Sequence, residues 1–266
     1  MPDVTIHMTP EQANRFDAIG RTLQIEPEPV APPVAPLPTQ RLDNTTVHIV
    51  VPMSWPHYPQ LAKAAMEELR RCPTTRKYET NDCSISSMRN AGVKAALADG
   101  ATHVLFVDAD MVFESDALER MLAHDVGVVG GLCRSRVRPF ASTLYRRDGA
   151  GTLKRMEPEG AGLQEFQATG GAFLLVAREV FEGLDKLGAG GHYFRDCRDR
   201  IDLPESERVS EDLFFCQLLE HAGHQLYVDL DVVVGHLATG VVTDKVDEDG
   251  SHHAIILLPK GIDTDA

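Results

Sequence analysis

The sequence contains no apolar run long enough to cross a membrane. No stretch approaches the roughly 18 consecutive apolar residues of a membrane-spanning helix, and the N-terminus lacks a basic segment followed by an apolar one. We therefore expect neither a membrane span nor secretion.

Closely spaced cysteines are also missing. The five cysteines, at positions 72, 83, 133, 197 and 216, are scattered and form no Cys-x-x-Cys pair. This pattern favours reduced thiols over a disulfide framework or a zinc site. Together with the missing membrane and secretion signals, it predicts a cytoplasmic protein.

Basic residues are fewer than acidic ones, with 26 lysines and arginines against 40 aspartates and glutamates. The net charge of −14 makes bulk electrostatic attraction to nucleic acid or to anionic membranes unfavourable. One local exception is a group of five arginines, and it leaves two interpretations open: a site for a phosphate-bearing donor or acceptor, nucleic acid included, or a solvated loop. The group consists of Arg134, Arg136, Arg138, Arg146 and Arg147.

The composition that is present suits one large core or two small ones. Hydrophobic residues make up 43% of 266 residues, and helix-like and strand-like stretches alternate, which indicates the α/β class. Residues 1–44 predict a short helix followed by a stiff proline-rich linker. We expect a folded domain over 45–240 and a C-terminal tail over 241–266 without an assigned role.

Apolar periodicity and turn residues place the elements of this domain. The loop after the first strand contains Trp55, which would stack on a base or fill an edge of the core. The stretch 188–208 lacks periodicity and is a candidate lid. The expected strands cover 46–51, 104–107, 127–132, 172–176 and 226–236, and the expected helices cover 60–71, 86–98, about 117–122, a segment from 178, and 213–221.

Two carboxylates follow the most apolar strand. The run Val104 to Val107 predicts a strand buried on both faces, and Asp108 and Asp110 come directly after it. Ligands of open α/β sheets bind beyond the carboxyl ends of strands. Side chains at i and i+2 of an extended segment point the same way, so both carboxylates could share one divalent cation. Alternatively, the segment is an ordinary turn that caps the next helix.

Three later motifs also have a functional and a structural interpretation. Gly170 and Gly171 precede a strand and either turn backbone N–H groups toward a ligand or form a bulge. Glu211 and Asp212 follow Ser210 and are explained as acids in the first turn of a capped helix. His236 closes the last expected strand.

The order of these motifs resembles that of the GT-A nucleotide-sugar glycosyltransferases. The resemblance covers roughly residues 45–239 and includes Arg89-Asn90 before the Asp-Ala-Asp strand. The nearest likenesses are the family-2-type enzymes and the polypeptide N-acetylgalactosaminyltransferase-like group. The resemblance implies a single Rossmann-like GT-A domain with a central mixed, mostly parallel sheet flanked by helices.

The resemblance also implies an activity and a set of roles. The enzyme would transfer a hexosyl or N-acetylhexosaminyl group from a UDP- or GDP-sugar to a hydroxyl, with Mn2+ or Mg2+ neutralising the diphosphate. The acceptor stays open among a small molecule, a protein, a glycan and a modified nucleobase. The implied metal ligands are Asp108, Asp110 and His236, the donor site is Asp108, Asp82, Arg89, Gly170 and Gly171, and the acceptor-side catalytic residue is Asp212 or Glu211.

Two other classes of function remain. Asp108-Ala109-Asp110-Met111-Val112 also fits the motif of haloacid-dehalogenase-type phosphohydrolases, in which Asp108 would be the nucleophile and Asp110 the acid. The chain could also bind a sugar nucleotide, or a partner through its proline-rich arm, without catalysis.

Overall fold

The computed structural model describes most of the expected domain. The described residues are 45–52, 75–80, 84–204, 208–237, 241–247 and 249–257. The expectations for the N-terminal helix, the proline-rich linker, Trp55, the helix 60–71 and Asp82 lie outside them. Within the described residues, no helix has the length and hydropathy needed to span a membrane.

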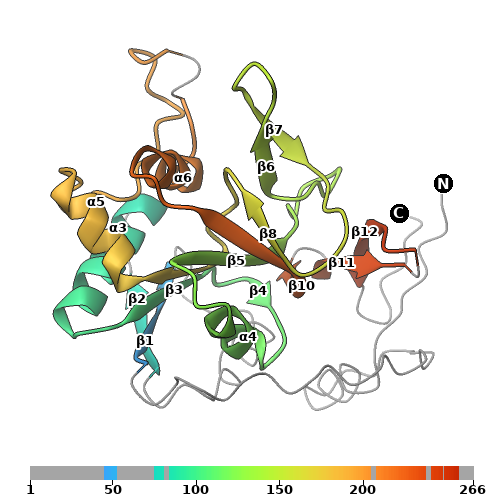
Figure 1. Ribbon diagram of the computed structural model, residues 1–266, viewed down its shortest axis with the longest axis horizontal. Coiled ribbons are helices and arrows are strands. Elements are labelled where there is room, and N and C mark those ends of the chain that lie inside the picture. Colours follow the sequence, from blue (N-terminus) through green and yellow to red (C-terminus); the bar gives the residue numbers. More distant parts are fainter. Residues whose placement is uncertain are drawn as a thin grey trace.

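A large mixed sheet forms the centre of the described chain (Figure 1). Its strand order is β12-β11-β10-β5-β9-β3-β1-β2, with β4 and β8 also pairing with β10. The strands are β1 (Val47–Pro52), β2 (Thr75–Thr80), β3 (His103–Val107), β4 (Met111–Val112), β5 (Val128–Cys133), β8 (Leu163–Phe166), β9 (Phe173–Ala177), β10 (Leu226–Leu237), β11 (Val241–Val246) and β12 (His252–Leu257).

Strand direction brings distant segments to one edge of this sheet. β2, β1 and β3 are mutually parallel, and β5 is parallel to β10. β9 lies between β3 and β5 and is antiparallel to both, so β3 and β5 run the same way. The carboxyl ends of β3, β5 and β10 therefore share an edge with the amino end of β9. The expectation of an α/β fold with a central mixed sheet is confirmed, with parallel pairing in β2-β1-β3 and between β5 and β10.

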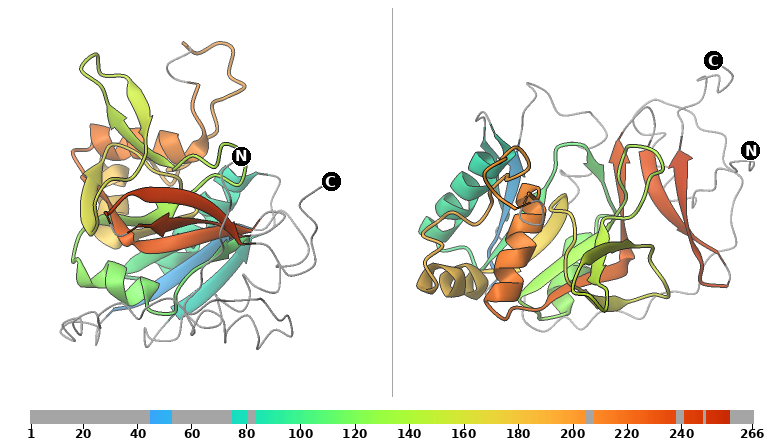
Figure 2. Two further views of the ribbon diagram at one scale, coloured as in Figure 1. Left: turned by 90° about the vertical axis from the view of Figure 1, so that its right-hand side faces the viewer. Right: turned by 90° about the horizontal axis from the view of Figure 1, so that it is seen from above.

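Helices cover both faces of the sheet (Figures 1 and 2). Alternate residues of β3 supply the two cores: Val104 and Phe106 belong to one cluster, and Leu105 and Val107 to the other. The first cluster includes residues of α3 (Ile85–Ala98), α5 (Arg178–Lys186) and α6 (Glu211–His221), and the second includes residues of α4 (Ala117–Ala123). The continuous apolar run of β3 thus reflects burial on both faces, as expected.

The helices near the site begin with different N-cap arrangements. Ser84 caps α3, where its hydroxyl accepts a hydrogen bond from the Ser87 N–H. Ser210 occupies the expected N-cap position of α6, but its hydroxyl donates to Asp212 instead of accepting from the helix. The helix α4 begins at Ala117, after β4, so the alternative in which Asp108 or Asp110 caps it is wrong.

The C-terminal region forms more structure than its sequence suggested. β10 is one strand with a register shift between Asp229 and Val233, and β11 and β12 add an antiparallel hairpin to its far end (Figure 2). The hairpin covers part of the segment expected to be a tail. A second hairpin, β6 (Leu144–Arg147) and β7 (Leu153–Met156), stands outside the large sheet.

Candidate functional site

The predicted motifs converge on the shared edge of the sheet. Asp108 follows β3, Gly171 lies just before β9, Glu211 begins α6, and His236 lies near the end of β10. Contacts between these segments connect residues more than a hundred positions apart. Asp82 is outside the described residues.

Asp110 and His236 face each other across two paired strands. Met111 of β4 lies opposite His236 of β10, and the Leu237 N–H donates to the Asp110 carbonyl at 2.9 Å. This pairing places Asp110 Oδ2 3.2 Å from His236 Nε2. A carboxylate and an imidazole nitrogen are thereby presented to one point at the sheet edge.

The contact of the other ring nitrogen of His236 determines which nitrogen of the ring carries a hydrogen. His236 Nδ1 lies 3.2 Å from the carbonyl oxygen of Arg134, which can only accept a hydrogen bond. Nδ1 therefore carries a hydrogen. In the neutral ring this leaves a lone pair on Nε2, directed at the Asp110 carboxylate, so either a second proton or a cation must lie between them.

Asp110 is held in its ionised form. Burial raises its pKa, but the hydrogen bond from His236 and the charges of His236 and Arg136 outweigh burial, so the pKa lies below its ordinary value. The Arg136 guanidinium contacts Asp110 Oδ2 at 2.6 Å and is half exposed. An exposed arginine thus occupies the same carboxylate oxygen that faces His236.

Asp108 belongs to a different set of contacts. After β3 the backbone turns, with the Met111 N–H donating to the Asp108 carbonyl, so the expected extended arrangement of Asp108 and Asp110 is wrong. Arg89 of α3 donates to Asp108 Oδ1 and to Glu211 Oε1, both at 2.9 Å. Because the Arg89 side chain is only 2% exposed, it joins these two carboxylates from beneath the surface.

Burial and charge act against each other in this arginine–carboxylate group. Desolvation lowers the pKa of Arg89, but the nearby acids Asp108, Glu211 and Asp212 together raise it by more. The pKa therefore lies above its ordinary value and the cation is retained. Burial raises the pKa of Glu211 despite the opposing effect of Arg89. The surroundings of Glu211 therefore favour its protonated form more than water does.

Gly171 has a packing role that the sequence did not specify. A β-carbon at this position would lie 3.0 Å from Cζ and Nη1 of Arg89. A side chain here would press on a guanidinium that two carboxylates already hold. Gly170 is less constrained, since its added β-carbon would meet Thr143 at 3.3 Å.

The arginine group does not form a single free patch. Arg134 is buried against Asp244 and Glu157, Arg136 contacts Asp110, and Arg147 pairs with Glu220. Arg138 and Arg146 stack on Phe140 and Phe166. Among the described predicted site residues, the Arg136 side chain contacts Asp110 and the backbone carbonyl of Arg134 contacts His236.

Sequence reasoning missed Cys133 beneath the site. Burial, then the charges of Asp108 and Asp110, raise the pKa of this buried thiol, which therefore stays protonated. Its position at the end of β5, next to Arg134, was the available signal, because β5 ends at the same edge as β3.

The described residues contain no group of three or more His, Cys, Asp and Glu side chains arranged to hold a metal ion. The donor set at the sheet edge is one carboxylate and one imidazole nitrogen, Asp110 and His236. Such a pair suits Mn2+ or Mg2+ whose other ligands are waters and substrate phosphate oxygens.

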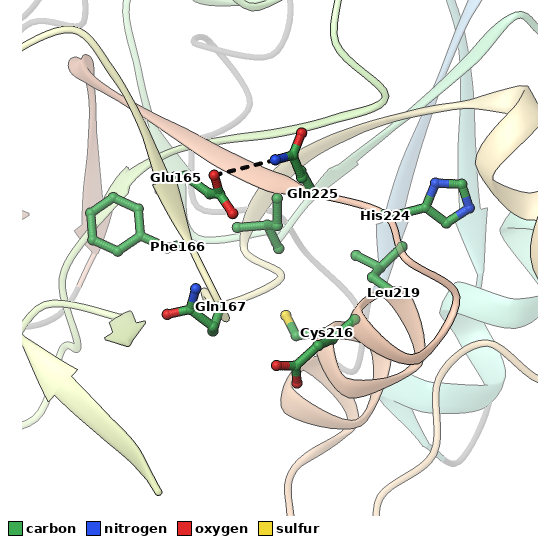
Figure 3. A pocket seen from close by; sticks show the side chains of 9 residues that line it. Glu165, Phe166, Gln167, Cys216, Leu219, His224 and Gln225 are labelled. Atoms are coloured by element: carbon green, nitrogen blue, oxygen red, sulfur yellow. Dashed lines mark hydrogen bonds between the residues drawn. The ribbon is translucent and has the colours of Figure 1, made fainter. Parts of the chain in front are cut away.

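A separate cavity of about 150 Å³ lies between α6, β8 and the start of β10 (Figure 3). Its lining includes Glu165, Cys216 and His224, and Glu165 accepts a 3.4 Å hydrogen bond from Gln225. None of the predicted site residues lines it.

No protein-family model matches the chain, and no curated protein matches its sequence. Solved structures similar to it include A197 from STIV, at 14% identity and a TM-score of 0.48, covering 84% of this chain and 100% of that one. Another is GalNAc-T7 with UDP, GalNAc and Mn2+, at 13% identity and a TM-score of 0.46. That match covers 74% of this chain and 44% of GalNAc-T7. Likenesses this distant leave the function to the geometry of the site.

Proposed function

We propose that the protein is a metal-dependent glycosyltransferase that moves a sugar from a nucleoside diphosphate sugar to a hydroxyl acceptor. The observation that carries the proposal is the pairing of Asp110 with His236 beside the Arg89-linked carboxylates Asp108 and Glu211. Motifs that are ordered along the sequence thus form two groups of contacts near the end of β3, one around Arg89 and one around Asp110 and His236.

Asp110 and His236 would hold the divalent cation. The cation, Mn2+ or Mg2+, would supply positive charge to the diphosphate leaving group. The Arg134 carbonyl orients the His236 ring so that Nε2 faces Asp110 Oδ2, and loss of the Nε2 proton would present both atoms to the cation. Arg136 would release Asp110 and turn its guanidinium to phosphate oxygens.

Asp108 would accept hydrogen bonds from the donor. Its Oδ1 is fixed by Arg89, and its side chain is 27% exposed. Arg89 itself is too deeply buried to reach a donor, so we assign it a positioning role in place of the donor contact expected from the sequence. Gly170 and Gly171 would keep the adjoining backbone close to this arginine and the donor.

Asp212 is the better candidate for taking the proton of the acceptor hydroxyl. Glu211 is mostly buried and paired with Arg89, whereas Asp212 is partly exposed on the same first turn of α6. Asp212 Oδ1 accepts from the Leu213 N–H and from Ser210, which fixes the carboxylate at the helix start. In an enzyme that inverts configuration, this carboxylate would be the general base.

The phosphohydrolase alternative receives no support from the site. In that mechanism Asp110 would have to donate a proton, yet its pKa lies below the ordinary value and it faces His236 and Arg136. An aspartate in these surroundings is a poor general acid near neutral pH.

The test is a thermal-shift screen of UDP, GDP, CDP and TDP sugars with and without Mn2+. A true donor stabilises the protein by RT ln(1 + [L]/Kd), about 2.7 kcal/mol at a hundredfold excess over Kd. We expect one nucleotide to stabilise the protein only with Mn2+, and His236→Ala to remove that effect. No stabilisation by any nucleotide with metal would refute the proposal.

A second experiment separates binding from catalysis. In the Asp212→Asn variant we expect the donor to stabilise the protein as in the wild type while sugar transfer or donor hydrolysis falls by about 100-fold or more. Asp231→Asn, a change on the exposed side of β10, is the matched control and should leave both unchanged.

A further inference from the structure

A buried charged cluster lies between the C-terminal hairpin and the candidate site. Arg134 Nε donates to Asp244 Oδ1 at 2.6 Å, and His252 Nδ1 contacts Asp244 Oδ2 at 2.5 Å. The side chains of Arg134, Asp244 and His252 are 3%, 0% and 1% exposed. We call these three residues the hairpin cluster.

The contacts of His252 complete this cluster. Its Nδ1 faces the carboxyl group of Asp244, and its Nε2 lies 2.7 Å from the carbonyl oxygen of Gly160. The buried Asp244 thus lies between Arg134 and His252, and Glu157 accepts a hydrogen bond from Arg134 Nη1 at 2.8 Å.

Such a cluster is costly to form and must hold its parts in fixed positions. Buried ions are tolerated only when each is paired and hydrogen-bonded, and the pairing is then strongly directional. Arg134 makes a further hydrogen bond to the Phe140 carbonyl at 3.2 Å. Its side chain is consequently anchored at several points, on β11 and on the loop that follows β5.

The anchored residue is also the one whose backbone orients His236. The Arg134 carbonyl accepts from His236 Nδ1, and His236 Nε2 faces Asp110. Val242 of β11 pairs with His236 in the sheet, and Asp244 lies two residues further along the same strand. The hairpin therefore reaches His236 both through the backbone and through Arg134.

We propose that the hairpin cluster positions His236 for cation binding, with Arg134, Asp244 and His252 as positioning residues. By fixing the Arg134 carbonyl, the cluster holds the Nδ1–H form of His236 and directs Nε2 toward Asp110. This inference rests on the proposed function, since it concerns the same cation site. It makes the hairpin β11–β12 a working part of the site.

The test uses the full chain and Mn2+ alone, without nucleotide. The double variant Arg134→Met with Asp244→Leu removes two opposite buried charges together. A protein tolerates the loss of a whole buried ion pair far better than the loss of one partner. The matched control, Arg147→Met with Glu220→Leu, removes another arginine–carboxylate pair, which joins β6 to α6 and has no contact with His236. Mn2+ affinity is measured by calorimetry, and the His236 tautomer by nitrogen chemical shifts in metal-free protein.

We expect the hairpin-cluster variant to bind Mn2+ at least about tenfold more weakly, a loss typical of removing support behind a metal-binding histidine. Its His236 shifts should move from the Nδ1–H form toward a mixture, while the control keeps the affinity and shifts of the wild type. His252→Gln, which keeps one donor toward Asp244, provides a milder variant that should show the same changes in smaller degree.

A folded hairpin-cluster variant with unchanged Mn2+ affinity and an unchanged His236 tautomer would overturn the proposal. If the double variant does not fold, His252→Gln decides in the same way. If the wild type binds no Mn2+, the cation site of the proposed function fails, and the tautomer measurement still judges whether the cluster positions His236.

Discussion

At the scale of single residues, Arg89 connects the elements that form the site. Its guanidinium joins α3 to the residue after β3 and to the first residue of α6. Replacing one member of a buried ion pair typically costs about 3–5 kcal/mol, because the remaining charge is left without a partner. The fixed position of the Arg89 guanidinium also explains the glycine at position 171, where a β-carbon would lie 3.0 Å from it.

We expect Gly171→Ala to lower the free energy of unfolding by about 1 kcal/mol or more, as overpacking does. The new β-carbon would lie 3.0 Å from the Arg89 guanidinium, which its two carboxylates prevent from moving freely. Gly149→Ala is the matched control, because a β-carbon there meets nothing within 4 Å. Denaturant unfolding of the two variants measures the difference, and equal stabilities would contradict the assignment.

At the scale of elements, the site depends on close contact between strands that hairpins and helices hold in place. β10 carries His236 and pairs with β4, β5, β8 and β11 along its length. Gly235 permits its approach to β11, since an added β-carbon would lie 2.5 Å from Val241 Cγ1. The pair Arg147–Glu220 similarly joins β6 to α6.

Gly235→Ala should separate β10 from β11 and cost about 1–3 kcal/mol. Val241 belongs to a paired strand and cannot withdraw without disturbing the pairing of Leu237 with it. Hydrogen exchange of the β11 amides checks this expectation, and faster exchange confined to β10 and β11 is the expected result. Protection equal to that of the wild type would show that the strands adapt without cost.

Glu220→Gln should produce a small, pH-dependent loss of stability. The hydrogen bond from Arg147 lowers the pKa of Glu220 below its ordinary value of 4.5. The ionised carboxylate therefore stabilises the fold above about pH 4.5, and this contribution disappears as the pH falls through the lower folded-state pKa. Because the pair is substantially exposed, we expect less than about 1 kcal/mol at pH 7. Unfolding curves of both proteins should converge in acid, and a pH-independent difference would contradict the prediction.

At the scale of the whole molecule, the central sheet separates two cores, and its strand β3 contributes side chains to both. β3 directs alternate side chains to α3, α5 and α6 on one face and to α4 on the other. The same strand ends at Asp108, so the packing of both layers determines where the site lies. Phe106 is central to the first layer, with ring centroids 4.9 Å from Phe194 and 6.5 Å from Phe181.

Phe106→Ala should lower the free energy of unfolding by about 3–5 kcal/mol through lost burial and a residual cavity. Ile201→Ala, a truncation of a side chain that is 85% exposed, should change it by no more than about 0.5 kcal/mol. Thermal and denaturant unfolding compare the two. A loss near 1 kcal/mol for Phe106→Ala would show that the layers can repack around the site.

The sequence by itself determined the class of fold, most of the central elements and the order of the site motifs. The apolar run before Asp108, the glycines before β9 and the acids at the start of α6 are local signals, because burial, backbone freedom and helix dipole act over a few residues. The hairpin β11–β12 gave a weaker local signal and was assigned no role.

Only the tertiary structure decided which of these residues touch. Asp110 and His236 are 126 positions apart, and Arg89 and Glu211 are 122 apart. Their contacts follow from strand order and direction, which periodicity does not encode, and from the turn after β3 that sends Asp108 and Asp110 to different partners. The support of His236 by Arg134, Asp244 and His252 has the same origin: charges far apart in sequence are paired because the sheet brings them into one buried volume.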